Sequence, residues 1–146
     1  MKSLKVLCLC FILVIALGGC GQKEIKMQDG SYTAQMSDYS FGWREFVTIT
    51  VKNGEIVSVQ YNAENESGFI KSWDSAYMKN MKTVTGTYPN EYTRYYAAQI
   101  MGQSELPDID SLSGASTSGG NFEKLSKAVV EQALKGDSQV VYVKSE

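Results

Sequence analysis

The residues of this chain that could carry chemistry gather in one short stretch, Asp110 to Gly119. It reads DSLSGASTSG and holds five hydroxyl side chains and two glycines. A side-chain hydroxyl is a potential nucleophile, and glycine permits the tight turns that expose one. A segment with helical spacing follows, and the unpaired N–H groups at a helix start attract phosphate. The stretch therefore predicts a hydroxyl-bearing phosphate site, with a flexible Ser/Gly loop that binds nothing as the alternative.

The residue inventory excludes several classes of chemistry. The chain has no histidine and three cysteines, of which Cys8 and Cys10 lie in an N-terminal apolar run and Cys20 ends it. Without histidine or a free thiol after Cys20, the chain lacks the usual parts of a hydrolase triad or a zinc centre, so we expect neither catalytic residues nor metal ligands. The net charge is −2, from 14 basic and 16 acidic residues. No basic stripe is present, so we expect no nucleic-acid partner.

The N-terminus predicts export and lipid attachment. Lys2 and Lys5 precede an apolar run, 6–17, which is shorter than the ~20 residues that span a bilayer and is typical of a signal-peptide core. The sequence LGGC that ends at Cys20 resembles the lipobox of bacterial lipoproteins. The resemblance implies cleavage before Cys20 and a lipid anchor that holds the protein on the outer, extracytoplasmic face of the cell membrane. An uncleaved N-terminal anchor is the alternative.

We therefore expect a lipoprotein signal peptide at 1–19, a polar lipidated tether at 20–28 and one domain at 29–146. Within the domain, alternating apolar residues indicate strands, and four-residue apolar spacing indicates helices. Their order predicts an α+β domain with a small, mostly antiparallel sheet and about three helices. Ser72 is the expected N-cap of the first helix and Gly86 its end. The expected strands are 30–36, 44–51, 55–61 and 139–144; the expected helices are 72–84, one that begins at 89 or 90, and 121–135; 108–120 is expected to be a loop.

The hairpin around Asn53-Gly54 allows two registers. A two-residue loop would pair Val51 with Ile56, which mixes polar and apolar positions on each face. A three-residue loop would pair Ile49 with Val57 and continue along one apolar face. We expect the three-residue loop, because it buries a consistent face.

The hydroxyl-rich stretch resembles a known family. It is similar to the flavinylation motif of the FMN-binding domain family, usually written Asp-x-x-Ser/Thr-Gly-Ala-Thr, and the matching positions are Asp110, Ser113, Gly114, Ala115 and Ser116. The segments DGSYTA, VTITVKNGEIVSVQY, KSWDSAYMKNM, GTYPNEY and AVVEQALKGD resemble the same domain in the same order, so the resemblance covers roughly 29–143. The family includes FMN-bearing subunits of sodium-pumping and related membrane oxidoreductases, and many small exported lipoproteins.

The resemblance implies that FMN is joined through a phosphoester bond to the last hydroxyl of the motif. A flavin transferase that uses FAD as donor makes this bond in the family. The acceptor position is Ser116 here, where the family usually has threonine, and serine offers an equivalent hydroxyl. Thr117 is a second candidate acceptor, and tightly bound noncovalent FMN is a third arrangement.

The remaining motif residues have expected roles that follow from their types. Gly114 and Ala115 would keep the loop thin enough to enter the active site of the transferase. Asp110 would orient the loop or assist the metal of the transferase, or it could form a simple Asx turn, and Ser113 could be a turn residue. Six aromatic residues are candidates for packing on the flavin ring, although aromatic side chains more often build the core. They are Tyr39, Phe41, Trp43, Tyr88, Tyr92 and Phe122.

These features favour an electron carrier over a free-standing enzyme. FMN on Ser116 would take electrons from a membrane redox donor such as a quinol-linked dehydrogenase, with the flavin supplying the redox chemistry and the protein its position. A noncatalytic surface lipoprotein that binds a phosphorylated ligand, or FMN noncovalently, is the alternative. A flavoenzyme that reduces a small substrate is a third hypothesis.

Overall fold

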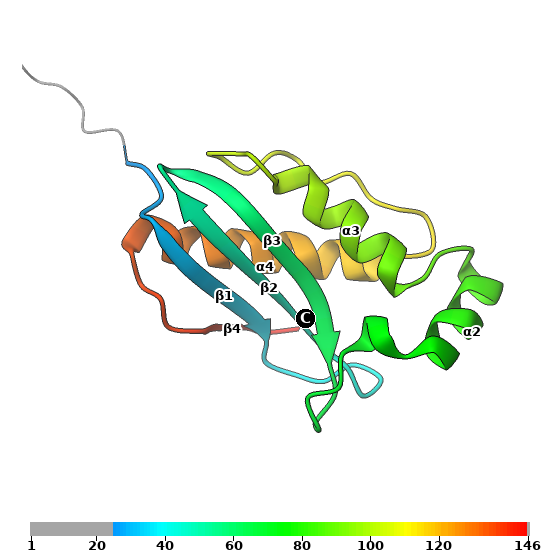
Figure 1. Ribbon diagram of the computed structural model, residues 1–146. Coiled ribbons are helices and arrows are strands. Elements are labelled where there is room, and N and C mark those ends of the chain that lie inside the picture. The colour runs from blue at the N-terminus through cyan, green and yellow to red at the C-terminus, as the bar shows by residue number, and fades with distance from the viewer. Residues whose placement is uncertain (1–24, 146) are drawn as a thin grey trace, which may run out of the picture.

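The computed structural model describes residues 25–145, so the predicted signal peptide and the predicted lipid attachment at Cys20 lie outside the described residues. Figure 1 shows a single sheet with its helices packed beside it. The prediction of an α+β domain with a mostly antiparallel sheet is confirmed. In chain order the elements are β1 (Gly30–Met36), β2 (Arg44–Lys52), β3 (Glu55–Glu64), the 3₁₀ turn η2 (Lys71–Trp73), α2 (Ser75–Thr85), α3 (Pro89–Ile100), α4 (Ser116–Lys135) and β4 (Val141–Val143).

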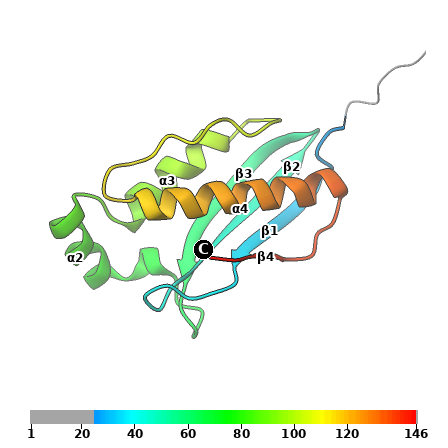
Figure 2. The ribbon, with the colours of Figure 1, turned by 180° about the vertical axis from the view of Figure 1, so that it is seen from behind.

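The sheet has four strands in the order β3-β2-β1-β4. β1 is antiparallel to β2, and β2 is antiparallel to β3, whereas β4 pairs parallel to β1 at the end of the chain. Helices α3 and α4 lie on the same face of this sheet, as the two opposite views show (Figures 1 and 2). The domain therefore has two layers, and the opposite face of the sheet is not covered by a described helix.

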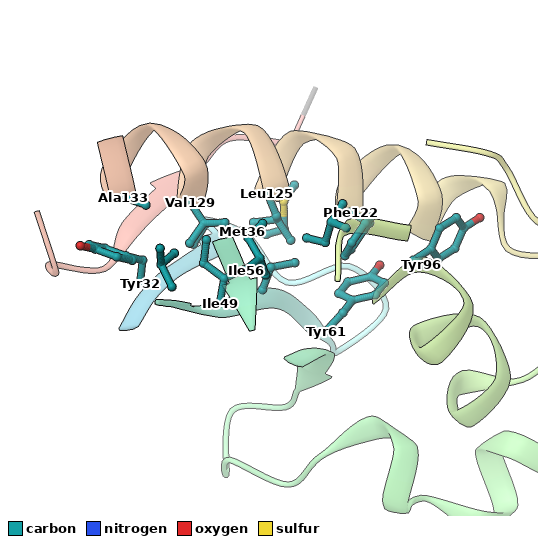
Figure 3. Packing of buried hydrophobic residues seen from close by; sticks show 14 of the residues in the cluster. Tyr32, Met36, Ile49, Ile56, Tyr61, Tyr96, Phe122, Leu125, Val129 and Ala133 are labelled. Atoms are coloured by element: carbon teal, nitrogen blue, oxygen red, sulfur yellow. The ribbon is translucent and has the colours of Figure 1, made fainter. Parts of the chain in front are cut away.

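The core lies between the sheet and its helices. Side chains of α4 at helical spacing point toward the sheet (Figure 3), and Phe122, Leu125, Val129 and Ala133 are fully buried there, as their spacing predicts. On β2, every second residue from Glu45 to Val51 is buried, so the predicted inward face of this strand is also confirmed.

The hairpin register differs from the expected one. Lys52 pairs with Glu55 and Val51 with Ile56, so Asn53 and Gly54 form a two-residue loop, with φ of 55° and 80°. These positive φ values at both central positions are those of a type I′ turn. The three-residue loop is therefore wrong.

A β-bulge after the turn reconciles this register with the apolar pattern. The pairing shifts between Thr50 and Val51, which leaves Val57 as the extra residue and places Ile49 opposite Val59. Val57 is consequently half exposed, while Ile56 is fully buried. The bulge brings the apolar residues of β3 onto the inner face without a longer loop.

Two helix starts also differ from the expected ones. Asp74, and not Ser72, caps α2, because its carboxylate accepts from the backbone N–H of Tyr77 at 2.9 Å. Ser72 is instead buried in η2, where its hydroxyl accepts from Asn62 at 2.7 Å. The last helix begins at Ser116 rather than near 121, so the second half of the hydroxyl-rich stretch is helical and not loop. Gly86, in the left-handed conformation, ends α2 as predicted.

The folded domain begins before residue 29. Met27 is 3% exposed and belongs to the core cluster, and the N–H of Gln28 donates to the carbonyl of Ala133 at 2.9 Å. The end of the predicted tether is therefore part of the domain. Because Ala133 lies near the end of α4, the chain enters the domain beside the C-terminal end of that helix.

Candidate functional site

The start of α4 opens onto a groove of about 840 Å³. Ser116 and Thr117 are both exposed there, and Ser116 is the first residue of the 20-residue helix. The opposite lining comes from the β1–β2 turn, η2 and α2. Aromatic and cationic side chains of this opposite lining face the hydroxyl groups, among them Phe41, Trp43, Lys71 and Tyr77, and Lys124 of α4 also lines the groove.

A tight turn places Ser116 at the helix start. The N–H of Ala115 donates to the carbonyl of Leu112 at 3.0 Å, with Gly114 at φ 81° between them. A Cβ on Gly114 would lie 3.2 Å from the carbonyl carbon of Thr85 and closer still to its oxygen. Glycine is therefore required at 114 for its positive φ and for the close approach of the end of α2.

The hydroxyl of Tyr96 holds both ends of this turn. It accepts from the N–H of Leu112 at 3.0 Å and donates to the carbonyl of Ala115 at 2.9 Å. Tyr96 is fully buried, and it fits because Gly119 has no side chain: a Cβ there would lie 2.8 Å from Cζ of the tyrosine. The turn before Ser116 is thus fixed on α3 by one side chain, which we call the Tyr96 clamp.

At the beginning of the stretch, α3 also holds Asp110. The side chain of Gln99 accepts from the N–H of Asp110 at 2.7 Å and donates to its carbonyl at 3.1 Å. Both contacts use the backbone of Asp110. The hydroxyl-rich stretch is therefore anchored on α3 at its beginning as well as at Ala115.

A buried carboxylate lies under the first turns of α4. Glu45 of β2 is 8% exposed and accepts from Ser118 Oγ at 2.7 Å, from the Tyr61 hydroxyl at 3.0 Å and from Asn121 Nδ2 at 2.5 Å. Its negative charge faces the positive end of the helix dipole. We call Glu45, Tyr61, Ser118 and Asn121 the Glu45 network.

The tyrosines around this carboxylate are held neutral. Burial, and secondly the charge of Glu45, raise the pKa of Tyr61 well above its usual value near 10. The same two causes, in the same order, raise the pKa of Tyr92. The Tyr61 hydroxyl also lies 2.7 Å from the carbonyl of Ser118, so its single proton faces two acceptors. Tyr61 therefore acts as a hydrogen-bond donor that helps to position the helix start.

The far wall of the groove is aromatic and cationic. The rings of Trp43 and Tyr77 meet edge to face with centroids 5.9 Å apart. Lys71 Nζ lies 4.7 Å from the centre of the Tyr77 ring and 5.9 Å from that of Trp43. The groove therefore combines hydroxyl groups, positive charge and aromatic surface.

The structure brings together part of the predicted site. Four of the predicted site residues line the groove: the motif residues Gly114, Ala115 and Ser116, and the second candidate acceptor Thr117. Asp110 and Ser113 are not among the described lining residues: Asp110 is held through its backbone, and Ser113 belongs to the turn. Gly114 and Ala115 are packed against α2 and α3, which gives them a structural role besides the expected thinness.

The aromatic candidates divide into two groups. Phe41 and Trp43 line the groove, whereas Tyr92 and Phe122 are 2% and 0% exposed and belong to the core. Tyr39 and Tyr88 lie elsewhere, each beneath a cation, Arg44 and Lys82 respectively. Sequence reasoning missed Glu45, Lys71, Tyr77 and Lys124. Of these, Glu45 carried a signal, because it is an acidic residue at an inward position of β2.

A smaller hollow of about 410 Å³ lies near the β2–β3 turn, and Gly54, Leu106 and Leu134 are in its lining. None of the predicted site residues lines it. Within residues 25–145, no helix has the length and apolar character needed to cross a membrane.

Comparison with known proteins gives a lipoprotein relative and a solved structure of the same fold. A comparison with models of known protein families finds no family model that matches the chain. The 15 kDa lipoprotein of Treponema pallidum (strain Nichols) is 28% identical over 130 residues, which cover 88% of this chain and 91% of that protein. This similarity indicates a lipoprotein family.

The crystal structure of the CPE2226 protein from Clostridium perfringens superposes with a TM-score of 0.77 and 30% identity, over 82% of this chain and 99% of that one. A solution structure of a protein from Clostridium thermocellum is 26% identical over 78% of this chain and 95% of that one, with a TM-score of 0.42. By its sequence identity over nearly all of the CPE2226 protein, this chain belongs to the same family as that protein.

Proposed function

We propose that this protein is a lipid-anchored extracytoplasmic flavoprotein that carries FMN covalently on Ser116 and transfers electrons. The observation that carries the proposal is the position of Ser116, an exposed hydroxyl at the start of α4 in the groove that the flavinylation-like motif lines. The lipobox-like sequence before Cys20 and the similarity to a treponemal lipoprotein support the anchor.

The residues of the groove suit FMN. A phosphate next to Ser116 would meet the positive end of the α4 dipole and the first-turn N–H groups, which no side chain of the N-cap residue Ala115 caps. Lys71 and Lys124 also line the groove and add positive charge. Trp43 and Tyr77 offer aromatic surface, and the volume of about 840 Å³ falls in the usual range of cofactor sites.

Attachment requires one bond to form and one to break. Ser116 Oγ would attack the flavin-side phosphorus of FAD in the transferase, the Ser116 proton would leave to a base of that enzyme, and AMP would depart as the leaving group. The Tyr96 clamp and the Glu45 network hold the acceptor in place. When bound, FMN supplies reversible electron transfer, and the protein supplies position and electrostatics.

The test is the mass and colour of the mature protein after co-expression with a flavin transferase. We expect one added FMN, with fluorescence that stays with the band in a denaturing gel. Ser116→Ala should lose both, whereas the neighbouring control Thr117→Ala should keep them. An adduct that persists in Ser116→Ala refutes Ser116 as the acceptor.

The second candidate is a noncatalytic surface lipoprotein whose groove binds a phosphorylated ligand or FMN noncovalently. The uncapped start of α4 and the nearby lysines favour it, because they suit a phosphate whether or not a bond forms. Colourless protein after co-expression that binds free FMN in calorimetry, equally well in Ser116→Ala, would favour this candidate over the first.

A further inference from the structure

Phe41 stands at the tip of the turn that joins β1 to β2. The turn is closed by two hydrogen bonds, from the N–H of Ser40 to the carbonyl of Trp43 at 2.8 Å and from the N–H of Trp43 to the carbonyl of Ser40 at 3.0 Å. Phe41 has φ 52° and Gly42 has φ 82°, so both central residues are left-handed. The Phe41 side chain is 99% exposed.

The position of Phe41 is strained, and its side chain gains nothing from burial that would offset the strain. The left-handed conformation is unfavourable for a bulky residue with a Cβ. The described chain shows the usual solution in its other two-residue turn, where Asn53 occupies the equivalent position before Gly54. Full exposure means that the phenyl ring also gains no burial in the free protein. Strain without a packing benefit points to a binding role.

The surroundings of Phe41 identify the site that it serves. Phe41 lines the same groove as Ser116, on the wall that holds Trp43. Trp43 is packed edge to face on Tyr77, so that this part of the wall is fixed. Phe41 follows Ser40, inside the turn that the Ser40–Trp43 bonds close, and its ring is both fully exposed and part of the groove lining.

We infer that Phe41 is the cover of the flavin: its ring packs on the isoalloxazine of an FMN held on Ser116, and shields it from water. This inference rests on the proposed function. A planar aromatic group in a groove open to solvent has one face toward the wall and one toward water, and an exposed phenyl ring at the rim matches that second face by apolar contact and stacking. Burial of both rings would offset the strain at φ 52°.

The test compares flavinylated Phe41→Ala with wild type and with Val84→Ala. Val84 is a matched control, because it is 83% exposed and is not among the groove-lining residues. We expect each of the three proteins to carry one FMN. In Phe41→Ala, quenching of the flavin fluorescence by iodide should increase, because the ring that shields the flavin from solvent is gone.

A second measurement reports on the strain itself. Phe41→Asn in the full mature protein without flavin should raise Tm by about 3–5 °C, the shift expected for relief of a left-handed bulky residue in a domain of this size. In the flavinylated protein this gain should shrink, since the contact with the flavin is lost together with the strain.

The outcomes separate the two proposals. Wild-type protein without an adduct refutes both. An adduct whose quenching by iodide is the same in Phe41→Ala and wild type refutes the cover alone, and so does an unchanged Tm for Phe41→Asn without flavin. Unchanged flavin spectra combined with slower electron exchange with a protein acceptor would also overturn the cover, by assigning Phe41 to partner docking.

Discussion

Gly119 and Gly120 are neighbours in the first turns of α4, yet alanine should have opposite effects at the two positions. A Cβ on Gly119 would lie 2.8 Å from Cζ of Tyr96 and closer still to its hydroxyl oxygen, whereas a Cβ on Gly120 would have nothing within 4 Å. Both residues are helical. The backbone preference is therefore shared, and the difference between the variants reports the space that the Tyr96 clamp needs.

The magnitudes can be worked from this geometry. Alanine is favoured over glycine inside a helix by about 0.5–1 kcal/mol, and Gly120→Ala should be more stable by that amount. In Gly119→Ala the same gain is opposed by overpacking of about 1–3 kcal/mol. Displacing the Tyr96 hydroxyl also breaks two hydrogen bonds, at about 1 kcal/mol each. The net loss for Gly119→Ala is about 2–4 kcal/mol.

Urea denaturation of the two variants and of Tyr96→Phe measures these values. Removing the hydroxyl relieves part of the overlap, so Gly119→Ala combined with Tyr96→Phe should cost less than the sum of the single changes. The yield of flavin on Ser116 should fall in Gly119→Ala, because the clamp holds the turn before the acceptor. If Gly119→Ala is as stable as Gly120→Ala, or if its cost adds to that of Tyr96→Phe, the reasoning about the clamp is refuted.

Three further predictions test the surrounding structure. Asp74→Ala removes the N-cap of α2 at a cost of about 1 kcal/mol; because α2 buries no residue, amide exchange should quicken within 75–85, and uniform quickening across the domain would contradict this. Glu45→Gln weakens the charge-assisted bonds from Ser118 and its neighbours and should cost about 1–3 kcal/mol in urea denaturation, so an unchanged midpoint would speak against the network. The raised pKa of Tyr61 means that its contribution to stability is fully present below about pH 10, the unfolded value, and is lost as pH rises above it. Tyr61→Phe should flatten this alkaline loss, and an unaltered pH profile would contradict the assignment.

The strands could be predicted from the sequence better than their pairing could. Alternation along β2 identified Val47, Ile49 and Val51 as inward, because a period of two is a property of the strand alone. The register of β2 depends also on the neighbouring strand β3 and on irregularities such as bulges in that strand. A single extra residue, Val57, permits the short Asn-Gly turn and the common apolar face together, and nothing local distinguishes it from the longer loop.

The motif predicted an acceptor but not its surroundings. Two glycines at 119 and 120 argue against a helix there by propensity, yet the helix begins at Ser116. Gly119 is required because Tyr96 packs against its backbone and leaves no room for a side chain, which the sequence pattern does not show. The cationic and aromatic wall comes from the β1–β2 turn, η2 and α2, which the fold brings to the groove from distant sequence. Such neighbours follow from topology, and Glu45 alone could have been found, from its acidic side chain on an inward position.

In the proposed lipid-anchored protein, the entry of the chain beside the end of α4 would bear on how the domain faces the membrane. A helix of 20 residues is about 30 Å long, and Ser116 lies at the end opposite Ala133, which bonds to Gln28. A domain standing upright on a lipid at Cys20 would therefore hold its groove roughly a helix length further out than its point of attachment. For the proposed electron carrier, exchange with a donor embedded in the bilayer would then require the domain to lie on its side, whereas a protruding or soluble partner would be reached upright. The tilt of the domain, more than the length of its tether, would decide which partner it serves.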